Sequence, residues 1–410
     1  MTDLGPRLLS AFGLVVMIAV AWLFSSDRRR IPWRTIATGL AIQLALGLLL
    51  LRTTPGRVFF VAMNDAVSVF LDYTQAGVQF VFGALATTGF SFVVNVLPVV
   101  VFMGAIFSIL YHLRVVEPVV ELLGRALARS MGTSGAESLS AVANVFLGMV
   151  ESPLLIKPYL ERMTESELFC VMTVGMASIA GSVLLVYVQM LGGGDYAGHL
   201  VTSSLLSAPA GILISKVMVP ERETPATLGR GHLDVPRIGA NLIDAAALGA
   251  IDGMRLCAYI GAMLLAFVSL IAMLNDGLGL LGGLVGLEAL TMQKLLGWAL
   301  APLAFVMGVP WQDAVPVGSL LGVKTVLNEF IAYHDLGNMI REGVLAPRSA
   351  VIASYALCGF ANFGSLAILL GGLGGMAPSR RGDIARLGLR SIVGGSLSSF
   401  MTGCIAGIFL

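Results

Sequence analysis

The chain has 410 residues, of which 57% are hydrophobic and only 12% are charged, and its mean hydropathy is +0.90. Soluble domains carry about twice this share of charged residues, so the composition excludes a soluble globular protein and predicts an all-α polytopic membrane protein. The net charge of +1 comes without a basic patch, so nothing points to a nucleic-acid partner.

The first apolar run is followed by the basic sequence SSDRRR. A signal peptide carries its positive charge before the apolar core, so we expect a retained transmembrane helix with its amino end outside. A span needs about 20 mostly apolar residues, and runs of this kind predict about eight transmembrane helices. They cover residues 8–25, 36–52, 92–112, 166–191, 200–218, 254–274, 349–374 and 388–409.

The loops between these spans predict the orientation of the chain. SSDRRRIPWR, HLR, PERETPATLGRGHLDVPR and APSRRGDIAR together hold 11 of the 25 lysines and arginines, and short basic loops stay in the cytoplasm. Both termini then lie on the periplasmic side, and the spans alternate only if residues 133–163 and 310–345 enter and leave on one side. The arms around GMVESP are too short to cross a bilayer. We therefore predict two re-entrant hairpins, whose tips are buried in protein or line a wet cavity.

One series of motifs occurs twice along the chain. LLGRALA and LLGWALA each precede a Met-Gly pair, then a carboxylate within an apolar segment (Glu151 or Glu329), then a Gly-Ser pair in the next span. An odd number of crossings separates the two units, which predicts inverted-topology repeats like those of secondary transporters. Each repeat has a span, a surface helix (115–130 or 286–306), a hairpin, a broken span and a span. The predicted units are N-terminal helices and an interfacial segment on the scaffold side (1–91), the first repeat (92–218), a cytoplasmic linker and approach helix (219–253) and the second repeat (254–410).

Ionisable side chains at membrane depth are costly and are usually functional. Glu151 and Glu329 either pair with a helix end or an arginine, or accept hydrogen bonds from a polar substrate, and we favour the substrate. Asn362 offers both a donor and an acceptor, and Ser365 lies one helical turn further on. Phe360 either stacks on a ligand or packs as an ordinary core residue.

Asn144 and Ser178 each lie beside a predicted helix break. Unwound carbonyls and two side-chain oxygens suit a dehydrated monovalent cation. The alternative is a simple hydrogen bond across helices, which is common for these residue types in membranes.

Catalytic motifs are missing from the sequence. It contains no HExxH, GxSxG or Walker sequence, and its four histidines lie apart from one another. The four cysteines lack the spacing of metal ligands. We therefore expect no catalytic residues, and we expect a transporter and not an enzyme. A channel would not need paired re-entrant tips related by inversion.

Three segments resemble motifs of the concentrative nucleoside transporter family. They are NEFIAY at 328–333, FANFGS at 360–365 and GGLGGMAPSRRGDIARLG at 371–388, and the resemblance covers the chain from about residue 92 onward. It implies a homotrimer in the bacterial inner membrane, with a static scaffold and a moving transport domain. The implied function is import of nucleosides by alternating access, coupled to a sodium gradient. Proton coupling, and another polar solute such as a modified nucleoside, are the alternatives. Besides the lipid bilayer, the expected partners are the nucleoside and sodium as coupling ion, with no further cofactor.

Carried over residue by residue, the resemblance also implies binding sites. It places the ribose at Glu329, Asn362 and Ser365, with Phe360 beside them. It places the nucleobase at Gly148, Met149, Val150, Glu151 and Val183. It places sodium at Asn144, Leu147, Ser178 and Ile179, with Leu147 and Ile179 binding through backbone carbonyls.

The first hairpin tip departs from the family pattern. Well-known members have Gly-Gln-Thr-Glu there, whereas this chain has Gly148-Met149-Val150-Glu151. A thioether and an isopropyl group replace an amide and a hydroxyl, and a site with fewer hydrogen-bonding groups discriminates more by shape. We therefore expect a base preference other than the ordinary pyrimidine one: broader, purine-leaning or set for a modified nucleoside.

Overall fold

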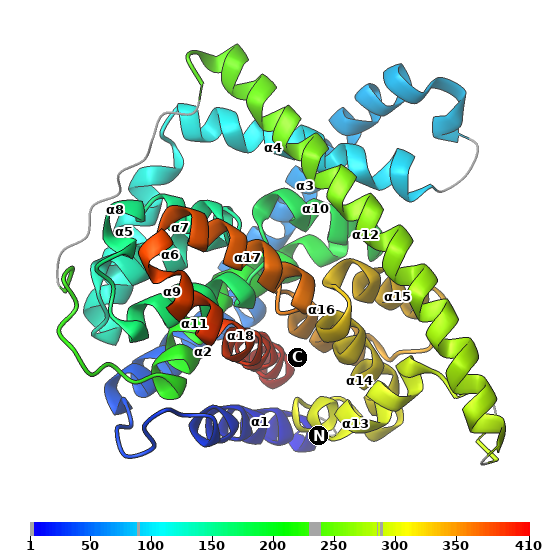
Figure 1. The fold of residues 1–410 in the computed structure, drawn as a ribbon. Coiled ribbons are helices and arrows are strands. Elements are labelled where there is room, and N and C mark those ends of the chain that lie inside the picture. The colour runs from blue at the N-terminus through cyan, green and yellow to red at the C-terminus, as the bar shows by residue number, and fades with distance from the viewer. Residues whose placement is uncertain (1–3, 88–90, 229–238, 285, 288–289) are drawn as a thin grey trace.

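The computed structural model describes residues 4–87, 91–228, 239–284, 286–287 and 290–410, and these residues contain helices and no β-strand. Figure 1 shows how the helices are arranged. In chain order they are α1 (Leu4–Leu23), α2 (Trp33–Arg52), α3 (Thr54–Phe82), α4 (Leu97–His112), α5 (Val116–Met131), α6 (Gly135–Phe146), α7 (Glu151–Leu154), α8 (Lys157–Leu160), α9 (Glu165–Ala177), α10 (Gly181–Met190), α11 (Ala197–Met218), α12 (Leu242–Leu284), α13 (Met292–Val306), α14 (Trp311–Val326), α15 (Glu329–Arg341), α16 (Pro347–Leu357), α17 (Phe363–Met376) and α18 (Arg381–Phe409).

Within the described ranges, seven helical segments are long and apolar enough to cross a membrane, and they match seven of the predicted spans. The eighth predicted span, 349–374, is divided at 358–362 into α16 and α17, of 11 and 14 residues. The bent pair α13 and α14, with an angle of 117° between them, could count as an eighth crossing by length and composition alone. The all-helical polytopic fold is therefore confirmed.

The predicted approach helix and the span after it are one continuous helix. α12 has 43 residues, which corresponds to about 65 Å at 1.5 Å per residue. The predicted boundary between units at 253/254 therefore falls inside this helix. The physical reason is that residues 242–284 contain no proline, so nothing in them interrupts the backbone hydrogen bonds.

Both predicted hairpins return to the side from which they start. At the root of the first, the Gly135 N–H donates to the Thr227 carbonyl at 3.0 Å, while Arg380 donates to the Glu161 carbonyl at 3.3 Å. The start and the return of the first hairpin therefore both contact segments at the basic end of the molecule.

The second hairpin is rooted at the opposite end. Asp313 near the start of α14 accepts a hydrogen bond from the Ala346 N–H at 3.1 Å. The Ala346 N–H stands just before α16, where the hairpin has returned.

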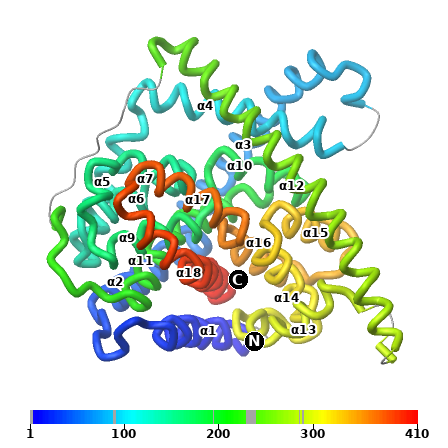
Figure 2. Tube along the Cα trace, viewed as in Figure 1, coloured from blue at the N-terminus to red at the C-terminus, as the bar shows by residue number. Residues whose placement is uncertain are grey.

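Two polar connections lie together at one end of the molecule, and the two termini lie at the other. The loop between α1 and α2 meets the end of α11, where the Ser26 N–H donates to the Met218 carbonyl at 2.8 Å. At the other end, Arg7 donates to the carbonyl of Leu410 at 3.0 Å, so the two termini lie together (Figure 2). Residues 229–238, part of the predicted cytoplasmic linker, lie outside the described residues.

The two repeats share one order of elements: α4 to α11 correspond to α12 to α18. Both surface helices are followed by a glycine with positive φ: Gly132 (+73°) directly after α5, and Gly308 (+99°) two residues after the end of α13. The glycine of LLGRALA, Gly124, packs against the first arm of its hairpin, and the glycine of LLGWALA, Gly297, does the same. The repeated sequence therefore specifies a repeated contact between surface helix and hairpin.

The helices α4 and α12 pack along each other through glycines, with Gly104 against Gly249 and Gly253 close by. α12 runs along one edge of the molecule in Figure 1. The sequence places residues 1–91 on the scaffold side, yet α1 and α2 pack against α11 and α18. The reason is a face of small residues: Gly13 contacts α18, and Gly39 contacts α11.

Candidate functional site

The second hairpin places a carboxylate at the start of its returning arm. Asn328 adopts an extended conformation and caps α15, with its Oδ1 accepting the Ile331 N–H at 3.0 Å. Glu329 is therefore the first residue of the helix, and its side chain is buried. The helix break thus carries the carboxylate into the protein interior.

Two neighbouring elements bind both oxygens of this carboxylate. Nδ2 of Asn362, from the break between α16 and α17, donates to Oε2 of Glu329 at 2.7 Å. The Tyr187 hydroxyl, from α10, donates to Oε1 at 3.1 Å. Because donors from two other elements hold both carboxyl oxygens, this cluster fixes the geometry between the hairpin and both broken helices.

The break between α16 and α17 carries the other residues predicted to bind the ribose. The side chain of Asn362 caps α17, with Oδ1 accepting the Ser365 N–H at 2.7 Å. The Asn362 N–H in turn donates to the carbonyl of Phe360 at 2.8 Å. Asn362 and Ser365 are buried and Phe360 is half-buried, so the structure brings the predicted residues of this break together with Glu329.

Tyr187 and Lys324 belong to this site and are missing from the sequence prediction. The ring of Tyr187 stacks on Tyr333 with 4.4 Å between centroids. Lys324 is fully buried, and its Nζ donates to the Ala356 carbonyl at 2.9 Å while interacting electrostatically with Glu329. Lys324 could have been found, because an ionisable residue at membrane depth is a functional signal. Tyr187 stands in an ordinary apolar run and gives no such signal.

The first hairpin tip is seated between two helices. The Cβ of Met149 lies 3.1 Å from the position of a Cβ added to Gly175 in α9, and Val150 Cγ1 lies 2.8 Å from one added to Gly372 in α17. The side chain of Val150 is therefore turned onto α17, and Met149 packs on α9 through its Cα and Cβ. Val183, at the start of α10, is also buried.

Glu151 differs from Glu329 in its surroundings. Its side chain is exposed, and its Oε2 occupies the space that a side chain at position 148 would need. Only glycine fits at Gly148 while the carboxylate folds back over the tip. Glu151 thus offers a carboxylate that is open to a ligand.

Asn144, Ser178 and Ile179, three of the four residues predicted to bind sodium, converge where the first hairpin meets the break between α9 and α10. The Ser178 hydroxyl lies 3.5 Å from the carbonyl oxygen of Asn144 and 3.2 Å from the carbonyl oxygen of Ile179, the next residue in the chain. Asn144 Oδ1 accepts from the Ser152 hydroxyl at 3.3 Å, and its Nδ2 donates to the Val174 carbonyl at 2.9 Å.

These groups form a buried cluster of oxygen atoms. Asn144 and Ser178 are at most 2% exposed, and half-buried Leu147 ends the arm in an extended conformation. Uncharged oxygens of this kind suit a monovalent cation. Across the described residues, no cluster of three His, Cys, Asp or Glu side chains could hold a transition metal.

Taken together, the site has two carboxylates, a buried ammonium group, an amide and a cluster of uncharged oxygens. It can accept hydrogen bonds from hydroxyl groups, donate to a polar ligand and hold a small cation. A cavity of about 730 Å³ lies elsewhere, beside α5, and none of the predicted site residues lines it.

Comparisons with known proteins agree with this arrangement. Family models described as Na⁺ dependent nucleoside transporter N-terminus, nucleoside recognition, and Na⁺ dependent nucleoside transporter C-terminus match residues 12–85, 93–194 and 199–407. The uncharacterized transporter YutK of Bacillus subtilis is 44% identical, over 97% of this chain and 98% of that protein. The nucleoside permease NupC of Helicobacter pylori is 41% identical, over 98% of each chain.

Solved structures give the same result. The transporter CNTnw in an inward-facing substrate-bound state matches with a TM-score of 0.92 and 45% identity, over 98% of each chain. Other structures of variants of that protein are described as outward-facing and intermediate states. The order of helices, the paired hairpins and these similarities show that the chain belongs to the Na⁺-dependent, or concentrative, nucleoside transporter family.

Proposed function

We propose that this protein imports nucleosides across the bacterial inner membrane, coupled to a sodium gradient, by alternating access. The observation that carries the proposal is the buried carboxylate of Glu329, held between the second hairpin, α10 and the break of α16 and α17. Such a group is retained at membrane depth at a free-energy cost, which is compensated when it binds a polar substrate.

The ribose is the part of the substrate that fits this carboxylate. Two hydroxyl groups of the sugar donate to Glu329. One N–H of Asn362 Nδ2 already donates to Glu329, and its second N–H can donate to a ribose oxygen. Ser365, in the first turn of α17, and Phe360 complete the sugar side. A ligand without these hydroxyls would leave buried polar groups unpaired, so the site rejects it.

The nucleobase falls to the first hairpin tip and to Val183. Because Met149 and Val150 pack on α9 and α17, this tip offers its backbone and the carboxylate of Glu151, without a side-chain amide or hydroxyl beside them. We therefore propose a base preference that is broader than the pyrimidine one or leans towards purines. Competition of uridine, cytidine, adenosine, guanosine and inosine for uptake tests this, and a strict uridine and cytidine preference contradicts it.

Sodium is the coupling ion that best fits the oxygen cluster of Asn144, Leu147, Ser178 and Ile179. Asn144 belongs to the first hairpin and Ser178 to the break between α9 and α10. An ion shared between them would fix the arm that carries the base-binding tip. Ion and substrate then favour the same conformation, which is the thermodynamic condition for coupling.

The moving body in this proposal comprises the hairpins, the broken helices, and α1, α2, α11 and α18, which pack on them. The pair α4 and α12 serves as the static scaffold, and three copies of it form the centre of a homotrimer. This departs from the placement of residues 1–91 on the scaffold side. The states described for CNTnw, from outward-facing to inward-facing, support rigid movement of such a body.

Uptake into proteoliposomes tests the proposal. We expect an inward sodium gradient to drive labelled nucleoside uphill and saturably. A matched proton gradient without sodium distinguishes proton coupling, and it should drive no accumulation. Conductance without saturation would indicate a channel, and uptake that follows neither gradient would contradict secondary active transport.

A further inference from the structure

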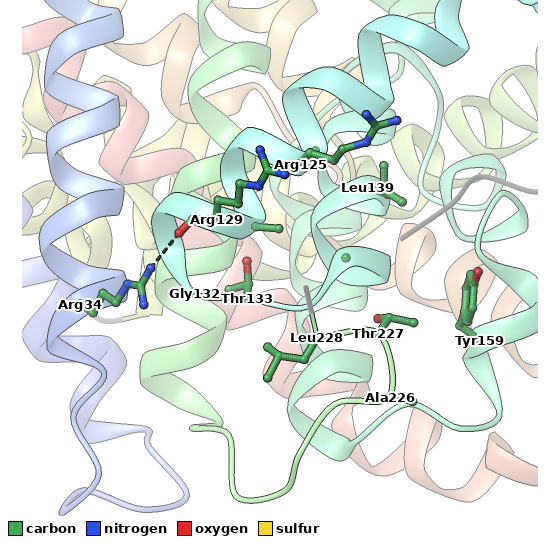
Figure 3. A pocket seen from close by; sticks show the side chains of 13 residues that line it. Arg34, Arg125, Arg129, Gly132, Thr133, Leu139, Tyr159, Ala226, Thr227 and Leu228 are labelled. Carbon is green, nitrogen blue, oxygen red and sulfur yellow. Dashed lines mark hydrogen bonds between the residues drawn. The ribbon is translucent and has the colours of Figure 1, made fainter. Parts of the chain in front are cut away.

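A cavity of about 730 Å³ lies beside the surface helix of the first repeat and shares no lining residue with the proposed transport site. Figure 3 shows its lining, with Arg34 from α2 and Arg125 and Arg129 from α5 around one side of it. Aspartate and glutamate are absent from the residues described as its lining. The cavity is therefore positively charged.

The backbone around the cavity positions one of these arginines. Nη2 of Arg34 donates to the carbonyl of Arg129 at 2.7 Å. The Arg34 guanidinium lies across Gly132, whose φ is +73° and where an added Cβ would stand 3.4 Å from it. A glycine at this position ends α5 in the left-handed conformation.

The other two arginines differ in their partners. Arg125 pairs with Glu121 one turn earlier on α5. For the side chain of Arg129, which is exposed, no hydrogen bond or ion pair occurs within the part of the chain that the structure describes. The charge of Arg129 is thus available to a ligand.

Two separate elements place these arginines at the boundary between lipid and water. On α5, Val119 and Leu122 are 43% and 68% exposed beside the polar stripe of Arg125 and Arg129, which is typical of a helix in the membrane interface. On α2, Trp33 is 69% exposed next to Arg34, and tryptophan concentrates at the level of the lipid headgroups.

We propose that this cavity binds the phosphate group of an anionic phospholipid. A guanidinium presents paired donors that match the oxygens of a phosphate, and basic pockets at this depth bind acidic headgroups. The volume exceeds that of a phosphate alone and leaves room for the rest of a headgroup. The hydroxyls of Thr133, Tyr159 and Thr227 also belong to lining residues, and the exposed apolar side of α5 can face the acyl chains.

The bound lipid would contact the root of the first hairpin. Thr227 lines the cavity and also caps α6: its carbonyl accepts the Gly135 N–H at 3.0 Å, and its hydroxyl accepts the Ala136 N–H at 3.1 Å. Occupancy of the cavity therefore stabilises the arm that leads to the hairpin tip. We expect anionic lipid to raise the thermal stability of the protein.

Lipid binding to the full-length protein tests the proposal without relying on transport. The purified protein is titrated with phosphatidylglycerol or with phosphatidylcholine, and binding is followed by native mass spectrometry and by thermal unfolding. We expect preference for phosphatidylglycerol, and a loss of affinity of about fivefold for each arginine removed in Arg125→Gln and Arg129→Gln. Arg29→Gln, an exposed arginine in the nearby loop between α1 and α2, is the matched control and should bind like the wild type.

Two further arms make the result decisive. Arg125→Lys with Arg129→Lys keeps the charge but removes the guanidinium fork, so we expect intermediate binding and intact folding. Equal binding of both lipids, or equal losses in the cavity variants and the Arg29→Gln control, would overturn the proposal. Full stabilisation by inorganic phosphate alone would also overturn it, because the ligand would then be a soluble anion.

Discussion

The two re-entrant hairpins occupy equivalent places in the repeats but present their carboxylates differently. Glu329 of the second hairpin is buried, with both oxygens held by Tyr187 and Asn362. Glu151 of the first is exposed and folds back over Gly148. Equivalent positions in an inverted repeat are therefore not equivalent sites. The Glu329 carboxylate is held by neighbouring side chains before a ligand binds, whereas the Glu151 carboxylate is open.

The helix breaks opposite the hairpins explain this difference. In the second repeat, the side chain of Asn362 caps α17 and also donates to Glu329. In the first repeat, Ala180 precedes α10 and makes no side-chain cap, while Ser178 faces the carbonyls of Asn144 and Ile179. An amide at the break suits a sugar, and a cluster of uncharged oxygens suits an ion.

The largest effect is expected when Glu329, the carboxylate held by Tyr187 and Asn362, is replaced. Glu329→Gln replaces one of the two acceptor oxygens by an NH₂ group and removes the carboxylate that accepts substrate hydroxyls. We expect the kcat/KM of nucleoside uptake to fall at least about a hundredfold, because buried polar groups are left unpaired. Initial rates in proteoliposomes give the measurement.

The matched control for this variant is Glu342→Gln. Glu342 follows the same helix, α15, and is exposed, so the same change of charge should leave uptake unchanged. Thermal unfolding of both variants shows whether each is folded. Near-normal uptake by folded Glu329→Gln would remove the ribose role from the second hairpin.

The next largest effect concerns the ion. Asn144→Ala removes a side-chain oxygen from the cluster and the hydrogen bond to the Val174 carbonyl. We expect the sodium concentration for half-maximal uptake to rise about thirtyfold, with a smaller change in the KM for nucleoside at saturating sodium. Ser182→Ala, a half-buried serine in α10 beyond the break, is the control. If Asn144→Ala changes the half-maximal sodium concentration and the KM for nucleoside equally, Asn144 is not specific to the ion.

Much of the fold follows from signals that are local in the sequence. The basic loops, the short arms around GMVESP and the repeated motifs predict both hairpins and the broken spans, because hydrophobic length and charge act within one segment. The contact between Glu329 and Asn362 joins two of the motifs that carry the family resemblance, and Ser178 lies beside Asn144, each next to a helix break.

Other features depend on which surfaces meet, and the sequence does not specify this. Tyr187 reaches Glu329 only because α10 crosses the tip of the second hairpin. The apolar residues Met149 and Val150 could face a ligand or a helix, and only the glycines opposite them show that they pack on α9 and α17. Likewise, the small residues of α1 and α2 predict close packing without naming the partner helix.

A smaller effect is expected at Tyr187, which was not predicted from the sequence. Tyr187→Phe keeps the ring on Tyr333 and removes the hydroxyl that donates to Glu329. Because a hydrogen bond to a charged group is lost, we expect uptake efficiency to fall about tenfold. Tyr73→Phe, which changes an exposed tyrosine of α3 outside both proposed sites, is the control. An unchanged KM and rate in Tyr187→Phe would show that the carboxylate needs no second donor.

The smallest expected effect concerns the packing of the first hairpin tip on α17 during transport. Gly372→Ala would place a methyl group 2.8 Å from Cγ1 of Val150, whereas Gly371 has nothing within 4 Å. We expect Gly372→Ala to slow uptake about fivefold through overpacking and Gly371→Ala to leave it unchanged. Val150→Ala in the Gly372→Ala background should restore the rate, because it removes the clash. If Gly372→Ala and Gly371→Ala behave alike, the tip moves off α17 in the rate-limiting state, and Val150 becomes free to contact the nucleobase.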